Sequence, residues 1–129
     1  MKRWTAREKV LQALYSIDMS KGDVSTAMEL VLEGKKEDEF LNELVNGVLN
    51  HQEEIDAKIS PLLEKWTLER LSYVDRNILR IATYELIFGS KDIPVNVILD
   101  EAIEVAKVFG DDNSSKFVNG LLSKLKNQL

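Results

Sequence analysis

The chain of 129 residues has no cysteine and only one histidine, His51. Without cysteine it has no disulfide, no thiolate metal ligand and no cysteine nucleophile. Without a second histidine it has no His-x-x-His metal-binding face. His51 follows Asn50 near an expected helix end, and we interpret it as a solvated residue. We therefore expect no metal site and no cofactor.

Long apolar runs are absent as well. No stretch reaches about 18 uninterrupted apolar residues, the length that a membrane span requires, and none follows the polar N-terminus as a secretion signal. The six glycines stand singly, so there is no glycine-rich phosphate loop. We expect a cytoplasmic protein with no membrane partner, and the lack of cysteine agrees with that location.

Patterns of catalytic residues are scarce too. Carboxylates pair at helical spacing, Asp100 with Glu104 and Glu53 with Asp56. Their faces are polar, however, and general acid–base catalysis needs a desolvated carboxyl group with a shifted pKa. We expect a binding module with no catalytic residues rather than an enzyme.

The charge of the chain is unevenly distributed around a net value of −5. Residues 1–9 have four cations against one acid, residues 113–129 have three lysines and no acid, and residues 23–43 have seven acids and two lysines. Charges farther apart than about 8–10 Å are screened. The basic ends are therefore expected to attract phosphate locally although the protein is acidic.

What the sequence does have is helical periodicity almost throughout, which predicts an all-α fold of six or seven helices with no strand. A Thr5-x-x-Glu8 capping box is expected to start the first helix and Gly22 to end it. Ser25 and Asp38 are expected to cap the next two helices.

The later helices have their own boundary signals. Pro61 is expected to kink or end a fourth helix. Ser72 starts a helix that is apolar around most of its circumference, which we place at the centre of the core, and Gly89 is expected to end it in the left-handed conformation. Pro94 opens the next helix and Gly110 closes it.

The last helix is expected to be capped by Asn113 or Ser114 and contains Gly120. Glycine costs about 1 kcal/mol against alanine inside a helix. We expect Gly120 to allow close contact with another helix, so that Gly120→Ala would destabilise the fold.

Three segments resemble a known family over essentially the whole chain. They are RWTAREKVLQALYSID near the start, LEKWTLERLSYVDRNILRIATYEL in the middle, and IPVNVILDEAIEVAKVFG with KFVNGLL at the end. They resemble the NusB family of bacterial transcription antitermination factors, and the last motif is the most specific. The resemblance implies two small helical bundles in one RNA-binding helical domain over residues 1–129.

The resemblance also implies a function. The family binds the boxA element of nascent RNA as a heterodimer with NusE, a ribosomal small-subunit protein, and helps RNA polymerase resist premature termination, notably on ribosomal RNA operons. The implied partners are single-stranded boxA-type RNA, NusE and the RNA polymerase antitermination complex. Formation of a homodimer stays open.

Positions that match the family's motifs supply the expected sites. The cations at the start of the first helix gain from the positive end of the helix dipole, and a polar side chain nearby is expected to reach a base edge. The expected RNA-binding residues are Lys2, Arg3, Arg7, Gln12, Lys116 and Phe117. The expected NusE-binding residues are Tyr15, Glu69 and Asp75.

Trp4 and Thr5 stand where arginines are common in the family. Trp4 either stacks on a base or packs ahead of the Thr5 cap as a hydrophobic staple, and we favour the staple. Two alternative functions stay open: a fragment of a ribosomal RNA methyltransferase that contains only its RNA-recognition domain, and a helical protein-interaction scaffold with no RNA role.

Overall fold

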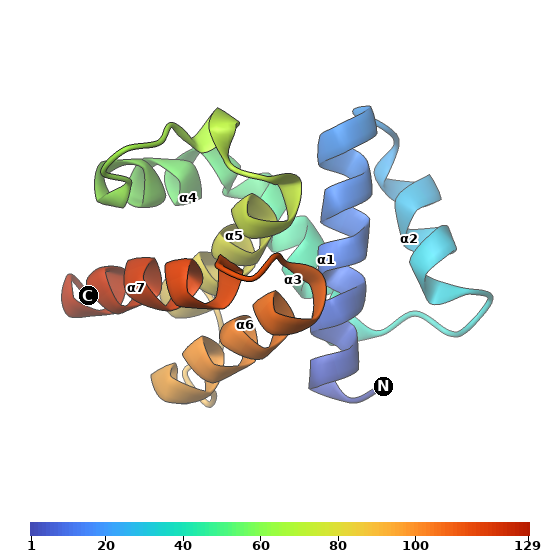
Figure 1. Cartoon of the computed structure of the whole chain (residues 1–129). Coiled ribbons are helices and arrows are strands. Elements are labelled where there is room, and N and C mark those ends of the chain that lie inside the picture. Colours follow the sequence, from blue (N-terminus) through green and yellow to red (C-terminus); the bar gives the residue numbers. More distant parts are fainter.

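The computed structural model describes all residues 1–129 as seven α-helices and two short 3₁₀ helices, with no strand (Figure 1). The elements are α1 (Arg3–Ser20), α2 (Val24–Leu32), α3 (Glu39–Asn50), α4 (Gln52–Ile59), η1 (Ser60–Leu62), η2 (Leu68–Arg70), α5 (Tyr73–Ile87), α6 (Val95–Phe109) and α7 (Ser114–Asn127). The expected all-α fold is confirmed. No helix combines the length and the apolar character needed to cross a bilayer.

Helix α5 lies at the centre of the molecule, as its apolar circumference predicted. Every residue from Arg76 to Leu86 is buried. Helices α1, α3, α4, α6 and α7 all pack against α5, whereas α2 packs on the outer side of α1 (Figure 1). One contiguous cluster of 29 buried apolar residues extends through all of these helices.

Buried charged side chains of α5 pair with half-buried acids from other helices. Asp18 of α1 accepts hydrogen bonds from Arg76 Nε at 2.9 Å and from Asn77 Nδ2 at 3.0 Å. Asp56 of α4 accepts two bonds from Arg80, each of 2.9 Å. A buried charge is costly unless it is paired, so these pairs fix how α1 and α4 dock on α5.

Several boundary signals are confirmed. The Asp38 side chain accepts a bond from Leu41 N at 3.0 Å, and the Ser72 hydroxyl accepts one from Asp75 N at 3.0 Å. Helix α4 ends just before Pro61, which lies in η1. The predicted starts and stops of α6, at Pro94 and Gly110, are also its observed cap positions.

The predicted limits of α1 are wrong. The helix begins at Arg3, with Lys2 at the cap position, and no side chain caps it, so the Thr5-x-x-Glu8 box lies within the helix. At its other end Lys21 is the left-handed residue, with φ of 57°. The chain has already left the helix when it reaches Gly22.

Two other boundaries differ from prediction, and the predicted cap of α7 is in place without its side-chain bond. Asp23 caps α2 in place of Ser25, since its carboxylate accepts the bond from Thr26 N at 3.1 Å. Gly89 is not left-handed. A Cβ at Gly89 would lie 2.6 Å from the Glu85 carbonyl oxygen, so glycine is needed there for close approach. Asn113 occupies the cap position of α7 but makes no side-chain cap bond.

His51 is half-buried at the junction of α3 and α4, not simply solvated. Its ring stacks on Phe88, with ring centroids 4.1 Å apart and planes at 17°. The histidine therefore contributes an aromatic contact to the end of α5.

Candidate nucleic-acid interface

The structure gives Arg7 a role different from the expected one. Its guanidinium donates to Glu85 twice, with Nε–Oε2 at 3.0 Å and Nη2–Oε1 at 2.7 Å. The two side chains are only 5% and 3% exposed. Arg7 lies on the inward stripe of α1, one turn before Val10, so its charge is neutralised inside the protein. It is not placed to contact phosphate.

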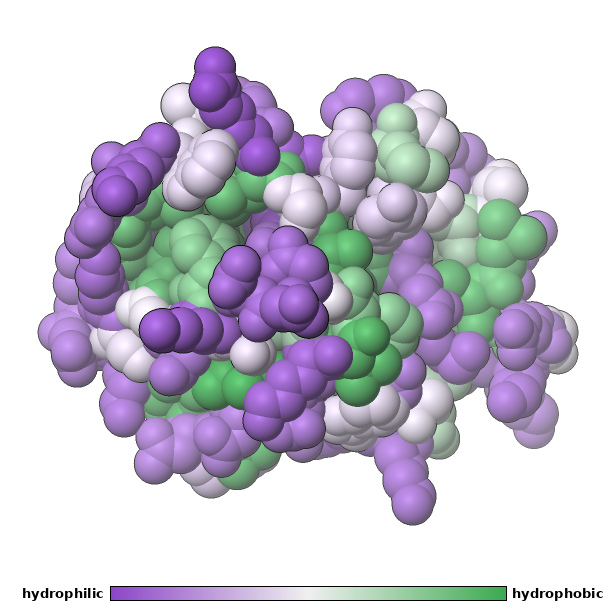
Figure 2. Space-filling model, viewed as in Figure 1, coloured by the Kyte–Doolittle hydropathy of each residue, from purple (hydrophilic) through white to green (hydrophobic).

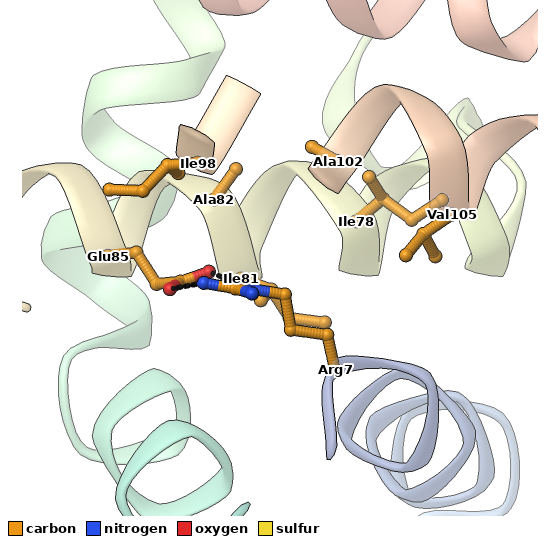
Figure 3. Close-up of a pocket in the computed structure, with 8 residues that line it drawn as sticks. All are labelled: Arg7, Ile78, Ile81, Ala82, Glu85, Ile98, Ala102 and Val105. Carbon is orange, nitrogen blue, oxygen red and sulfur yellow. Dashed lines mark hydrogen bonds and ion pairs between the residues drawn. The ribbon is translucent and has the colours of Figure 1, made fainter. Parts of the chain in front are cut away.

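A small cavity lies beside this ion pair (Figure 3). Its other walls are apolar side chains of α5 and α6: Ile78, Ile81, Ala82, Ile98, Ala102 and Val105. It encloses about 20 Å³, which is room for about one water molecule. The cavity is too small to bind a cofactor or a base.

The other predicted residues of the N-terminal region do not form one surface. The Arg3 guanidinium lies 4.9 Å above the Phe40 ring, and Glu43 and Glu85 line the same hollow. Lys2 and Gln12 are exposed. The expected cationic cluster is therefore divided: Arg7 points inward, Arg3 rests on an aromatic ring beside acids, and Lys2 faces solvent.

Lys116 and Phe117, in contrast, line a clear surface groove between α7 and the segment that follows η1. The groove, which we call the α7 groove, encloses about 360 Å³. Six residues that shape it are Leu63, Lys65, Trp66, Lys116, Phe117 and Gly120. Figure 2 shows apolar side chains gathered there, between α7 and the α4–η1 region, with hydrophilic residues around them.

Trp66 is the groove residue that the sequence analysis missed as a site. Its side chain is 55% exposed, an unusual state for a large aromatic residue. The signal was available in the sequence, because Trp66 stands in the polar segment between η1 and η2 and has no helical apolar stripe to join. Its position beside Lys65 makes it a candidate for base stacking.

The lysines of the groove differ in whether their ammonium groups form ion pairs within the protein. Lys124 donates to Glu64 at 2.7 Å, and this bond is the main reason why the pKa of Glu64 lies below its usual value. Lys65 and Lys116 form no ion pair with the protein. These two ammonium groups are available to an anionic ligand.

Gly120 lies open on this groove, and the expectation of close helix contact there is wrong. A Cβ built at Gly120 meets no heavy atom within 4 Å. Instead of admitting another helix, the missing side chain leaves the α7 surface of the groove clear.

Tyr15 and Glu69, two of the expected partner-binding residues, are linked by a chain of contacts through Tyr73 and Arg76. Tyr15 meets Tyr73 edge to face, with centroids 5.8 Å apart, and the Arg76 guanidinium lies 4.8 Å from the Tyr73 centroid. Glu69 is exposed, and its carbonyl oxygen is 3.4 Å from Arg76 Nη1. Tyr73, which is 38% exposed, adds a second aromatic ring to this face.

Asp75 projects from a different side of α5. Residues two positions apart in a helix, such as Tyr73 and Asp75, point about 200° apart around its axis. Asp75 therefore does not share the face of Tyr73. It is half-buried near Ser114 and Asp111 at the start of α7, and burial is the main cause of its raised pKa. Its Oδ1 atom is buried without a hydrogen-bond partner.

Comparisons with known proteins agree on one family. The sequence matches the NusB family over residues 4–127. It is 54% identical to transcription antitermination protein NusB of Bacillus subtilis, covering 100% of this chain and 98% of that protein. It is 56% identical to the NusB protein of Geobacillus kaustophilus, covering 98% and 96% of the two chains.

Solved structures give the same result. The fold is similar to that of T. maritima NusB, with a TM-score of 0.90 at 41% identity, over 99% of this chain and 92% of that one. It is also similar, with a TM-score of 0.87 at 32% identity and complete coverage of both chains, to a chain in a crystal structure of antitermination factors NusB and NusE with double-stranded RNA.

Proposed function

Because the chain belongs to the NusB family of transcription antitermination proteins, we propose that it binds boxA-type single-stranded RNA of nascent transcripts together with NusE. It acts in the cytoplasm, as part of the RNA polymerase antitermination complex, with residues 1–129 as one RNA-binding helical domain. The family consists of antitermination factors and not of enzymes. The similarity of this chain to a chain in the structure of NusB and NusE with double-stranded RNA supports this assignment.

The α7 groove is the observation that supports RNA binding most directly. It joins an exposed Trp66 and a half-buried Phe117 to the unpaired ammonium groups of Lys65 and Lys116. Unpaired bases stack on aromatic side chains, while lysines contact the phosphates between them. A groove with both elements fits a single strand better than a duplex, whose bases are already stacked.

The remaining expected residues have secondary places in the proposal. Lys2, Arg3 and Gln12 extend the RNA contact at the start of α1, with Arg3 the most restrained of the three. Arg7 is no longer included, because its charge is satisfied inside the protein.

NusE is proposed to bind the aromatic face formed by Tyr15 and Tyr73 next to Glu69. Amphipathic aromatic residues are common in the centre of protein interfaces, where they bury area and keep a polar tip. Asp75 is a secondary candidate, since its carboxylate is half-buried beside α7.

The first test measures boxA RNA affinity for Trp66→Ala and Lys116→Gln, with and without NusE. Loss of one base stack costs about 1–3 kcal/mol, so Trp66→Ala is expected to weaken binding about 5- to 150-fold. Lys116→Gln is expected to lower the log–log salt slope by about 0.7, the value for one phosphate contact on a single strand.

Lys58→Gln is the matched control, because Lys58 is equally charged and exposed on α4 but lies outside the groove. Scrambled RNA is the second control. Equal affinity of wild type and both groove variants for boxA RNA would contradict the proposed site. Binding of NusE with no affinity for any RNA would favour the scaffold alternative.

The methyltransferase alternative is no longer supported. The sequence match covers 98% of the Bacillus subtilis relative, and that relative is an antitermination protein rather than a methyltransferase.

A further inference from the structure

A second concave surface lies far from the α7 groove, between the start of α1 and the segment of residues 33–38 that joins α2 to α3. It encloses about 430 Å³, and Met1 is its only hydrophobic lining residue. Four lysines line it: Lys2, Lys9, Lys35 and Lys36. We call it the lysine hollow. In Figure 1 the segment after α2 passes beside the N-terminal end of α1, where this hollow lies.

The fold brings these lysines together from distant parts of the sequence. Glu33 and Gly34 both have positive φ, of 53° and 78°, and they reverse the chain at the end of α2. The amide of Lys35 then donates to the Leu32 carbonyl at 3.0 Å, which fixes the turn. The reversal directs residues 35–38 back toward α1.

Lys9 joins α1 to the end of α2, just before this segment. Its ammonium group donates to the carbonyl oxygen of Val31, in the last turn of α2, at 2.8 Å. A lysine near the C-terminal end of a helix also interacts favourably with the helix dipole. Lys9 is therefore held in place at the wall of the hollow.

The hollow has an excess of unused positive charge. Lys2, Lys35 and Lys36 make no ion pair and no side-chain hydrogen bond within the chain. Of the two acids that line it, Asp38 already accepts the Leu41 amide at 3.0 Å and lies 3.8 Å from the N-terminal amine. Only the Glu37 carboxylate remains to oppose three free ammonium groups.

This local excess contrasts with the surrounding sequence. Residues 23–43 have seven acids and two lysines, and both of those lysines, Lys35 and Lys36, face the hollow. The hollow has four lysines against two acids, and a concave surface with an excess of one sign of charge attracts the opposite charge. The chemical group that fits is a phosphate, which several lysines contact together.

We propose that the lysine hollow binds backbone phosphates of the same RNA strand that the α7 groove holds. The inference rests on the proposed RNA-binding function and adds a second contact region, from the α2–α3 segment, to it. The segments that line the hollow and those that line the groove lie on opposite sides of the molecule in Figure 1. A strand that reaches both must cross the protein, so the contribution of the hollow depends on RNA length.

The test uses the double variant Lys35→Gln/Lys36→Gln in the full chain with NusE. The control is Lys58→Gln/Lys107→Gln, which removes the same charge from exposed positions outside both surfaces. Affinity is measured over a salt series for a boxA RNA of minimal length and for versions extended by flanking nucleotides on either side.

With an extended RNA, the Lys35/Lys36 variant is expected to lose about 1.4 from the log–log salt slope, the value for two single-strand phosphate contacts. The control variant and the minimal RNA are expected to show no such loss. An unchanged slope and affinity of the variant with every extended RNA would overturn the proposal, while Trp66→Ala tests the proposed function separately.

A second arm titrates the isolated protein with inorganic phosphate at constant ionic strength and follows the backbone amide signals of residues 33–38 by NMR. Shifts that disappear in the double variant, together with its weaker binding of extended RNA, support the hollow as a phosphate site on the RNA path. Such shifts with unaffected RNA binding would show a site for free anions only and would overturn the proposal.

Discussion

At the scale of single residues, the contrast between Arg7 and Trp66 shows that residue type alone does not predict whether a side chain is exposed. An arginine in a basic N-terminal segment suggests a ligand contact, whereas tryptophan, by residue type alone, is usually largely buried. The structure buries the guanidinium of Arg7 against Glu85 and leaves the Trp66 ring 55% exposed. The face of the helix on which a residue lies decides whether its side chain is available.

Gly120→Ala is expected to raise stability, which reverses the expectation from sequence. The added methyl group meets no atom within 4 Å, and alanine is better than glycine in a helix interior by about 1 kcal/mol. The measurement is the free energy of unfolding from urea denaturation. A lower stability than wild type would show that the surface around Gly120 is more crowded than the structure indicates.

At the scale of secondary-structure elements, an unfavourable electrostatic interaction at the junction of α5 with the start of α7 lowers the stability of the fold. The Asp75 carboxylate is half-buried there, Asp111 repels it, and its Oδ1 atom has no hydrogen-bond partner. Burial raises its pKa, although the nearby hydroxyl groups of Ser114 and Ser72 act in the opposite direction.

Asp75→Asn is therefore expected to stabilise the protein at neutral pH. A raised pKa in the folded state means that the folded protein binds the proton more tightly than the unfolded chain does. The ionised carboxylate thus costs stability above the folded pKa, and the cost vanishes as pH falls below the unfolded value of about 3.8.

The measurement is the melting temperature of the variant and of wild type between about pH 4 and pH 7, around the ordinary Asp pKa. The advantage of the variant over wild type should be largest at the upper end and shrink toward the lower end. An advantage that is constant with pH would point to a cause other than ionisation.

At the scale of the whole molecule, the Arg7–Glu85 pair joins α1, and with it the lysine hollow, to α5, around which the C-terminal helices pack. Removing one member of a buried ion pair leaves the other charge without a partner, which costs about 3–5 kcal/mol. Both Arg7→Ala and Glu85→Gln are expected to lower the free energy of unfolding, as measured by chemical denaturation.

Arg3→Ala is the control for this pair, since Arg3 is exposed and makes no ion pair. It is expected to change stability by far less. A wild-type stability for Arg7→Ala, combined with a reduced salt slope for RNA binding, would return Arg7 to the set of phosphate contacts.

The sequence alone determined the helical class, the central place of α5 and several helix ends. Apolar spacing, the Asp38 and Ser72 side chains and Pro61 act within a few residues, so their effects are visible locally. The family was visible too, because its motifs lie in continuous segments. The limits of α1 were missed because the capping box at Thr5 and Glu8 has a plausible local geometry that the fold did not use.

Only the tertiary structure decided which polar and aromatic residues face the solvent together. Lys65 and Trp66 meet Lys116 and Phe117 across the α7 groove although some 50 positions separate them in the chain. Lys35 and Lys36 reach Lys2 only because two left-handed residues reverse the chain after α2. Such neighbours depend on how the helices dock, and docking is set by buried contacts such as Arg7–Glu85 that local sequence patterns do not specify.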